Sequence, residues 1–214
     1  MDYFDAVTKR RSIRKFHASA VPPEVIERAL DAALLAPSSS NMQPWEFYWV
    51  QTPDAKRELI EACLSQATAR TAAEIVVAVA RCDTWRRNRD LVLERIHTGS
   101  GGTKMQLQYY EKIVPVAYTL GWFNFWGIVK AILMWTLGWF RPVARGPFSR
   151  AELFQVLVKT TALACENFML AIVAQGYGCC PMEGFDERRV KKILRLGRHA
   201  RVVMAISVGD ADDD

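Results

Sequence analysis

The chain has 214 residues, half of them apolar, with 28 lysines and arginines against 23 acidic residues and a formal net charge of +5. This length and composition predict one folded domain with a sizeable core. The charge suits an anionic small ligand or an anionic membrane surface, and it is too weak to indicate nucleic-acid binding. The five cysteines are odd in number and irregularly spaced, which argues against a disulfide framework and indicates a reducing cytoplasm.

The N-terminal part predicts alternating helices and strands. Its first residues, Met1-Asp2-Tyr3-Phe4-Asp5, carry two acids and do not resemble a secretory signal. Residues 2–9 predict a short helix, and residues 22–35 a second helix with apolar residues at helical spacing. Residues 46–50 and 74–80 predict strands, and residues 53–70 predict one helix between them.

An insertion of unusual composition follows, over about residues 84–146. Residues 86–95 predict a charged helix, and residues 97–103 predict a flexible break rich in glycine. Residues 114–140 are very apolar, with four tryptophans and Lys130 as the single charge. Glycines at positions 121, 127 and 138 predict that a helix in this stretch is kinked or broken.

The C-terminal part returns to the helix and strand pattern. Ser149-Arg-Ala-Glu152 is typical of a capping box and predicts the start of a long helix that stops near Gly176. Residues 179–184 predict a turn, residues 186–196 a short basic helix, and residues 201–208 a strand. Helices that separate strands indicate an α+β fold, and we expect residues 1–214 to form a single domain.

Three segments carry residues suited to a phosphorylated planar cofactor. In the first, residues 10–14, an extended backbone places Arg10, Ser12 and Arg14 on one face and Arg11 and Ile13 on the other. Two guanidinium groups flanking a hydroxyl can hold a phosphate and reach the polyol chain beside it. A solvated basic turn after a helix is the alternative interpretation.

The second and third segments contribute polar groups of other kinds. Residues 37–45, between a helix and a strand, offer three serines, an asparagine and a glutamine as hydroxyl and amide groups, although a plain loop would look similar. In residues 179–184, proline and glycine predict a turn whose backbone N–H groups point toward a ligand. Cys179 and Cys180 could form a redox pair, and we favour the alternative that they are buried apolar side chains.

Together these segments resemble the FMN-dependent nitroreductase family. The sequences Arg-Arg-Ser-Ile-Arg-Lys-Phe, Pro-Ser-Ser-Ser-Asn-Met-Gln-Pro-Trp and Pro-Met-Glu-Gly-Phe occur in the family's order and at its separations, within similarity over residues 1–82 and 149–209. The resemblance implies a nitroreductase-like α+β fold, with a central mixed, mainly antiparallel sheet flanked by helices. It also implies a homodimer with two FMN sites at the subunit interface.

The resemblance further implies a cofactor site and a reaction. Arg10, Ser12 and Arg14, with Arg11 beside them, would hold the phosphate and ribityl chain. Ser38, Ser39 and Ser40 would come from the partner subunit, with Asn41 and Gln43 near the flavin. Pro181 and Met182 would pack on the ring, and the Glu183 and Gly184 amides would lie at its N5. The flavin would carry the chemistry without a catalytic side chain, taking hydride from NADH or NADPH and reducing a nitroarene, quinone or enone.

Three alternatives stay open at this stage. Two keep the flavin and change the reaction, to reductive dehalogenation or to oxidation of a peptide azoline. The third is a non-catalytic, membrane-associated flavin-binding protein. No metal site is expected, because His17, His97 and His199 are scattered and no paired ligand spacing exists.

Two features depart from the family pattern. The printed sequence ends at Asp214 without the basic C-terminal arm that the family adds to the phosphate site. The apolar stretch 114–140 is too short for two membrane crossings of roughly 20 residues each. One crossing would separate Arg10 from Gly184, which the expected site needs together. We therefore expect the stretch to form an apolar lid or dimer contact, or to lie peripherally in a membrane interface.

Overall fold

The computed structural model describes residues 1–99 and 102–212, without the side chain of Trp122. It divides into two compact units. Unit 1 comprises Met1–Pro37, Trp45–Arg81 and Thr161–Asp214, and unit 2 comprises Ser38–Pro44 and Cys82–Thr160. We describe each unit by itself.

Unit 1 is built on a four-stranded antiparallel sheet in the order β1-β2-β4-β3. Its strands are β1 (Trp45–Trp49), β2 (Glu74–Arg81), β3 (Gly178–Met182) and β4 (Ala200–Gly209). β2 is buried along most of its length, as expected for an inner strand rich in valine and alanine. Beyond the outer strand β3, the N-terminal segment adds an isolated parallel bridge between Ser12 and Cys179.

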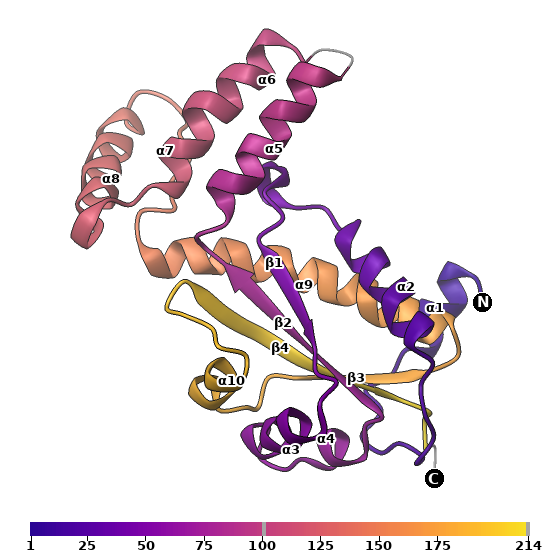
Figure 1. Cartoon of the computed structure of the whole chain (residues 1–214). Helices are drawn as coiled ribbons and strands as arrows, with labels where there is room; N and C mark the ends of the chain where they lie inside the picture. The colour runs from indigo at the N-terminus through magenta and orange to yellow at the C-terminus, as the bar shows by residue number, and fades with distance from the viewer. Residues whose placement is uncertain (100–101, 213–214) are drawn as a thin grey trace. The chain divides into compact units, whose positions relative to one another are not determined.

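Helices pack on both faces of this sheet (Figure 1). On one face, α3 (Pro53–Ala62), α4 (Ala67–Thr71) and α10 (Glu187–Ile193) enclose a core with β2 residues Ile75, Val77 and Val79. On the other face, Phe168 of α9 (Arg150–Ala174) stacks on Phe47 of β1, with ring centroids 6.4 Å apart. The remaining helices of unit 1 are α1 (Tyr3–Lys9) and α2 (Pro23–Leu34).

Unit 2 is helical. A 3₁₀ turn, η1 (Ser39–Asn41), is followed far along the chain by α5 (Trp85–Thr98), α6 (Lys104–Gln108), the π-helical turn η2 (Tyr109–Ile113), α7 (Val114–Tyr118), η3 (Trp122–Asn124) and α8 (Phe125–Leu137). Trp85 and Tyr118 are buried against each other, with ring centroids 5.7 Å apart. The aromatic contact therefore joins the start of α5 to the end of α7.

Most predicted elements are present, with two corrections. The single helix predicted over residues 53–70 is two helices, because Leu64 and Ser65 adopt left-handed conformations with φ of 59° and 51°. Residues 179–182, predicted as part of a turn, belong instead to strand β3 (Gly178–Met182). The prediction of a broken apolar helix is confirmed, since α7 ends at Tyr118 and α8 begins at Phe125.

The start of α9 agrees only in part with the predicted capping box. Ser149 caps α9 by accepting a hydrogen bond from the Glu152 N–H at 3.2 Å, but the Glu152 carboxylate accepts from the Phe148 N–H rather than closing the capping box. The flexible break predicted over residues 97–103 lies partly outside the described residues.

Within the described part, α9 is the one helix with the length and hydropathy of a membrane span, and half of its most apolar window is buried, as in a core helix.

Candidate functional site

The first and third segments come together in unit 1. Ile13 donates its backbone N–H to the carbonyl of Cys179 at 3.1 Å, so residues 10–14 run alongside β3. Burial raises the pKa of the Cys179 thiol to about 12, and the nearby positive charge of Arg10 opposes that rise. The Arg10 guanidinium is therefore close enough to the strand to act on this thiol electrostatically. Two segments about 170 residues apart in sequence form one structural feature.

A pocket of about 390 Å³ lies where these segments meet. Ser12 and Arg14 line it from the N-terminal segment, and Pro181 and Glu183 line it from the end of β3 and the following turn. Arg11 and Ile13 line a different hollow, of about 320 Å³. This division agrees with the alternation predicted for residues 10–14 at four of the five positions, whereas Arg10, predicted on the face of Ser12 and Arg14, lines neither of these two hollows.

The side chains of Arg11 and Arg14, in the same short segment, have different surroundings. The Arg11 guanidinium donates to the carbonyls of Thr8 and Arg10, both at 2.8 Å, at the C-terminal end of α1. Within the described residues, the Arg14 guanidinium has no hydrogen bond or ion pair, and its side chain is exposed at the pocket. An unpaired guanidinium beside a hydroxyl is a suitable anchor for a phosphate.

The turn after β3 presents backbone groups. Glu183 and Gly184 are exposed, and the Gly184 N–H has no hydrogen bond within the described part of the chain. Gly184 is not among the residues that line the pocket, although its neighbour Glu183 is. Met182 also lines the pocket, but it is only 3% exposed and its sulfur accepts a hydrogen bond from Ser207 at 3.7 Å. Most of the Met182 side chain therefore belongs to the core.

Gln66 and Thr68 line the same pocket and were missed by the sequence analysis. Gln66 donates to the carbonyls of Gly184 at 2.7 Å and of Cys63 at 2.9 Å, and Thr68 donates to the carbonyl of Ile13 at 3.4 Å. The left-handed turn at Leu64 and Ser65 directs the chain into this position. Neither glycine nor proline marks that turn, so the sequence offered no signal for it.

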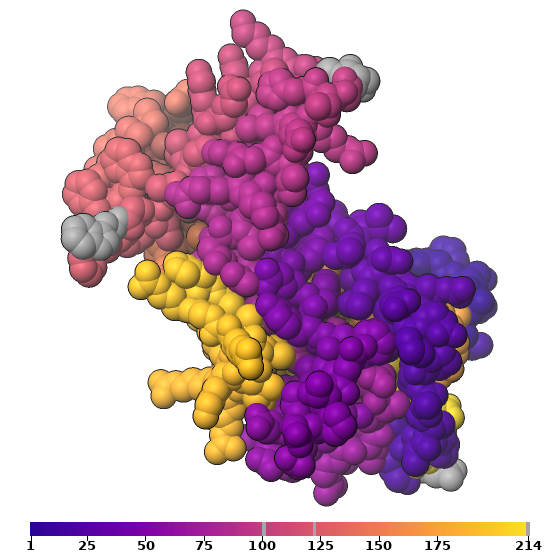
Figure 2. All heavy atoms as spheres, viewed as in Figure 1, coloured from indigo at the N-terminus to yellow at the C-terminus, as the bar shows by residue number. Residues whose placement is uncertain are grey.

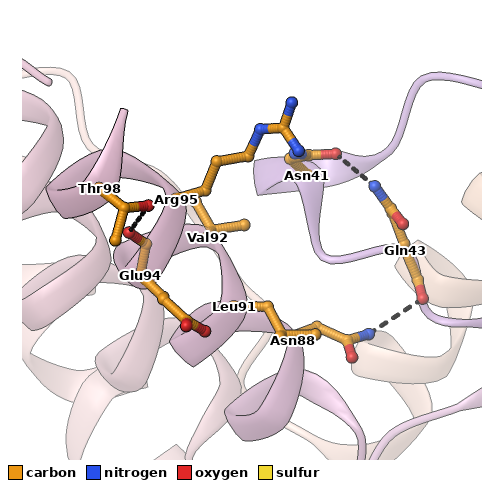
Figure 3. A pocket seen from close by; sticks show the side chains of 8 residues that line it. All are labelled: Asn41, Gln43, Asn88, Leu91, Val92, Glu94, Arg95 and Thr98. Carbon is orange, nitrogen blue, oxygen red and sulfur yellow. Dashed lines mark hydrogen bonds between the residues drawn. The ribbon is translucent and has the colours of Figure 1, made fainter. Parts of the chain in front are cut away.

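The second segment lies in unit 2 (Figure 3). Asn41 and Gln43 line a hollow of about 420 Å³ together with α5 residues, among them Asn88 and Arg95. Gln43 donates its side-chain amide to Asn41 at 3.0 Å, and Asn88 donates to the backbone carbonyl of Gln43 at 3.1 Å. These bonds hold two of the predicted site residues in fixed positions.

The backbone of this second segment is strained. Ser40, Asn41 and Gln43 all have positive φ, between 42° and 55°. Such conformations are rare for residues other than glycine and are concentrated at functional sites. The Ser38 hydroxyl accepts from the Gln43 N–H at 3.1 Å, the Ser40 hydroxyl lies 2.7 Å from that of Tyr109, and Ser39 is exposed on η1.

The structure thus divides the predicted site residues between the two units. The unit 1 pocket is lined by Ser12, Arg14, Pro181, Met182 and Glu183. Gly184 is adjacent to Glu183 in sequence, Arg10 lies two residues before Ser12, and Arg11 lines the other hollow. Asn41 and Gln43 line the hollow of unit 2. In unit 1 the guanidinium, hydroxyl and amide donors fit a phosphorylated ligand with a polyol chain, which is the donor set that FMN requires. Cys179 and Cys180 are both buried free thiols, as we favoured.

Comparisons with known proteins agree with this geometry. The nitroreductase family model matches residues 7–210. The NADH dehydrogenase of Thermus thermophilus is 29% identical over 98% of this chain and 86% of its own length. Iodotyrosine deiodinase 1 of Rattus norvegicus is 43% identical over 63 residues, which are 28% of this chain and 22% of that protein.

Solved structures confirm the fold. A structure described as a nitroreductase in complex with FMN, from Exiguobacterium sibiricum, superposes with a TM-score of 0.72 at 22% identity, covering 100% of this chain and 90% of that one. The α+β fold and the family expected from the three segments are therefore confirmed. The sheet is more uniform than expected, because its four described strands all pair antiparallel.

Proposed function

Since the chain belongs to the nitroreductase family, we propose that it is an FMN-dependent oxidoreductase that takes hydride from NADH or NADPH and reduces an electron-poor acceptor. The observation that carries the proposal is the pocket where Ser12 and Arg14 meet Pro181 and Glu183. The similarity to an NADH dehydrogenase along nearly the whole chain supports this class of enzyme, and the similarity to a nitroreductase in complex with FMN supports this cofactor.

The side chains around the pocket bind and orient the cofactor in this proposal. Arg14 and Ser12 hold the phosphate, with Arg10 contributing positive charge and Thr68 a hydroxyl near the ribityl chain. The unpaired N–H of Gly184 and that of Glu183 are donors toward the ring. Bound FMN supplies hydride transfer at its N5, so no side-chain acid or base is required.

We also propose that the active form is a homodimer, in which Ser38, Ser39 and Ser40 of one subunit serve the site of the other. The strained backbone at Ser40, Asn41 and Gln43 supports a functional role for this segment. We infer a cytoplasmic location, which the five free cysteines support.

Anaerobic stopped-flow spectroscopy of the FMN-loaded protein tests the proposed reaction. We expect NADH or NADPH to bleach the visible absorbance of the bound flavin, and a quinone, nitroarene or enone to restore it in a second mixing step. A protein without added FMN serves as the control. Flavin that binds tightly but is reduced by neither nicotinamide would contradict the proposal.

Reductive dehalogenation is a second candidate function, favoured by the local match to iodotyrosine deiodinase 1. That match covers 22% of the deiodinase, so it supports a shared local sequence more than a shared substrate. The same experiment separates the two candidates. Reoxidation of the reduced protein by iodotyrosine with release of iodide, and no reaction with quinones or nitroarenes, would favour dehalogenation.

A further inference from the structure

Helix α8 and the turn that follows it expose a wide apolar face. Its large apolar side chains are between 49% and 88% exposed: Phe125, Trp126, Ile128, Ile132, Leu133, Trp135, Trp139 and Phe140. At 100° per residue the six of these positions that lie within α8 fall on one contiguous half of the helix circumference, and Trp139 and Phe140 lie in the turn that follows the helix. The opposite half, with Gly127 and Lys130, is buried or half-buried within unit 2. The surface half of this helix is therefore the more apolar one, the reverse of an ordinary surface helix.

The two polar side chains of α8, Lys130 and Thr136, both make hydrogen bonds to backbone carbonyls. Thr136 is the one polar residue on the face, and its hydroxyl donates to the carbonyl of Leu133 at 2.9 Å. Lys130 is directed inward, where its amine donates to the carbonyls of Val116 at 2.8 Å and Thr119 at 3.0 Å. The face thus presents hydrocarbon and indole groups without an unpaired charge, which suits contact with an apolar phase.

Charge within residues 112–151, which contain α8, has a single sign, and the nearest acids in sequence, Glu111 and Glu152, border this stretch at its two ends. Residues 112–151 contain no acidic residue, and they contain five basic ones: Lys112, Lys130, Arg141, Arg145 and Arg150. Unit 2 as a whole has eleven lysines and arginines against five acids, a formal net charge of +6 that exceeds the +5 of the entire chain. The positive charge of the protein is therefore concentrated in the unit that carries the apolar face. In Figure 2 the atoms of this segment, pink to orange, form part of the visible surface of unit 2.

We propose that the α8 face docks on the surface of an anionic lipid bilayer. A helix of 13 residues is about 20 Å long, too short to cross a hydrocarbon core of about 30 Å, so α8 would lie in the plane of the interface. Tryptophans are favoured at that depth, and Trp135 and Trp139 pack edge to face with centroids 5.1 Å apart. Anionic headgroups would supply negative charge opposite the exposed Arg141 and Arg145, which follow the helix.

A second copy of the chain is the competing occupant of this face. Pairing two identical faces would bring the exposed Arg141 and Arg145 of both copies together, and residues 112–151 of neither copy contain an acidic residue to neutralise them. Like charges in contact oppose such an association. The charge pattern therefore favours lipid over self-association, and the experiment separates them.

Vesicle flotation with the purified full chain tests the proposal. We expect the protein to float with vesicles of phosphatidylcholine mixed with phosphatidylglycerol and much less with phosphatidylcholine alone, and added salt should weaken the binding. Trp139→Glu should lower binding at least about tenfold. Met105→Glu is the matched control, because Met105 is 77% exposed on α6 of the same unit and Trp139 is 72% exposed.

A second pair of variants tests the charge without altering the apolar face. Arg141→Gln should weaken binding to anionic vesicles about fivefold, whereas Lys104→Gln, an exposed cation on α6, should have little effect. Light scattering should show the same oligomeric state for the wild type and Trp139→Glu. Wild-type protein that stays with the unbound fraction, or a Trp139→Glu variant that floats like the wild type, would overturn the proposal. Dissociation of an oligomer by Trp139→Glu without lipid binding would assign the face to a second copy.

Discussion

Arg11 and Arg14 lie three positions apart in one extended segment, and their side chains have different surroundings. Both are exposed arginines in the same basic segment, yet one is engaged by the carbonyls of Thr8 and Arg10 and the other is open to a pocket. Cations near the C-terminal end of a helix stabilise it through its dipole, which is a structural role for Arg11. We therefore expect ligand binding in this region to depend on Arg14 far more than on Arg11.

Gln66 is the residue whose substitution tests the link between α4 and the turn after β3. Gln66→Glu keeps the size of the side chain but removes the donor to the Gly184 carbonyl, so we expect a loss of about 1 kcal/mol in the free energy of unfolding. FMN affinity should fall as well, because the turn loses its anchor and a carboxylate enters the pocket proposed for the phosphate. Urea denaturation and FMN titration measure the two effects. An unchanged affinity would show that the turn is positioned without Gln66.

At the scale of elements, the break between α3 and α4 shapes the unit 1 pocket. Leu64 adopts a φ of 59° and is 68% exposed, so its side chain gains little from burial while its backbone is strained. The conformation persists because Ser65 and Cys63 make backbone hydrogen bonds to α3 and Gln66 anchors the following turn. A strained connection is thus held by the contacts on either side of it.

Leu64→Gly should relieve this strain and raise the free energy of unfolding by up to about 1 kcal/mol. Leu35→Gly is the matched control, because Leu35 is 84% exposed at the end of α2 with a right-handed φ of −83°. There glycine only adds freedom to the unfolded chain and should destabilise by about 0.5–1 kcal/mol. Thermal or chemical denaturation of the two variants gives the comparison. Equal effects of the same sign would contradict the role of the left-handed turn.

At the scale of the whole molecule, buried thiols make stability depend on alkaline pH. Burial raises the pKa of Cys63 to about 11 and of Cys165 and Cys179 to about 12, from an ordinary value of 9.0. Above pH 9 the unfolded chain releases these protons while the native state retains them. The native state therefore loses stability as pH rises from about 9 toward 12, and keeps this contribution in full below pH 9.

We expect the free energy of unfolding to fall by up to about 1.4 kcal/mol per pH unit for each such thiol above pH 9. Denaturation under reducing conditions at a series of pH values measures the slope. Cys165→Ala should reduce the slope of unfolding free energy against pH by the contribution of one thiol. Substitution of Cys82, which is half-buried, should change this slope less. A stability that stays constant between pH 9 and 11 would contradict the account.

The sequence predicted much of this molecule because its signals are local. The alternation of Ser12 and Arg14 with Arg11 and Ile13 follows from the geometry of an extended chain, and the division between two hollows agrees with it. β3 was missed because its five residues include Gly178 and Pro181, which are unfavourable in strands, and pairing with β4 overrides that preference. Gln66 was missed because its position depends on a turn without glycine or proline. How Ser38, Ser39 and Ser40 serve a site across a subunit pair stays a prediction.

The measurement that bears most directly on the central claim compares FMN with riboflavin, which lacks the phosphate. Equilibrium titration of the wild type should show FMN binding at least about tenfold more tightly, as expected for charge-assisted hydrogen bonds to the phosphate. Arg14→Gln should remove most of that difference, and Arg11→Gln should leave it nearly intact. Equal affinities for the two flavins in the wild type, or an Arg14→Gln variant that still prefers FMN as strongly, would contradict the assignment of the unit 1 pocket as the flavin phosphate site.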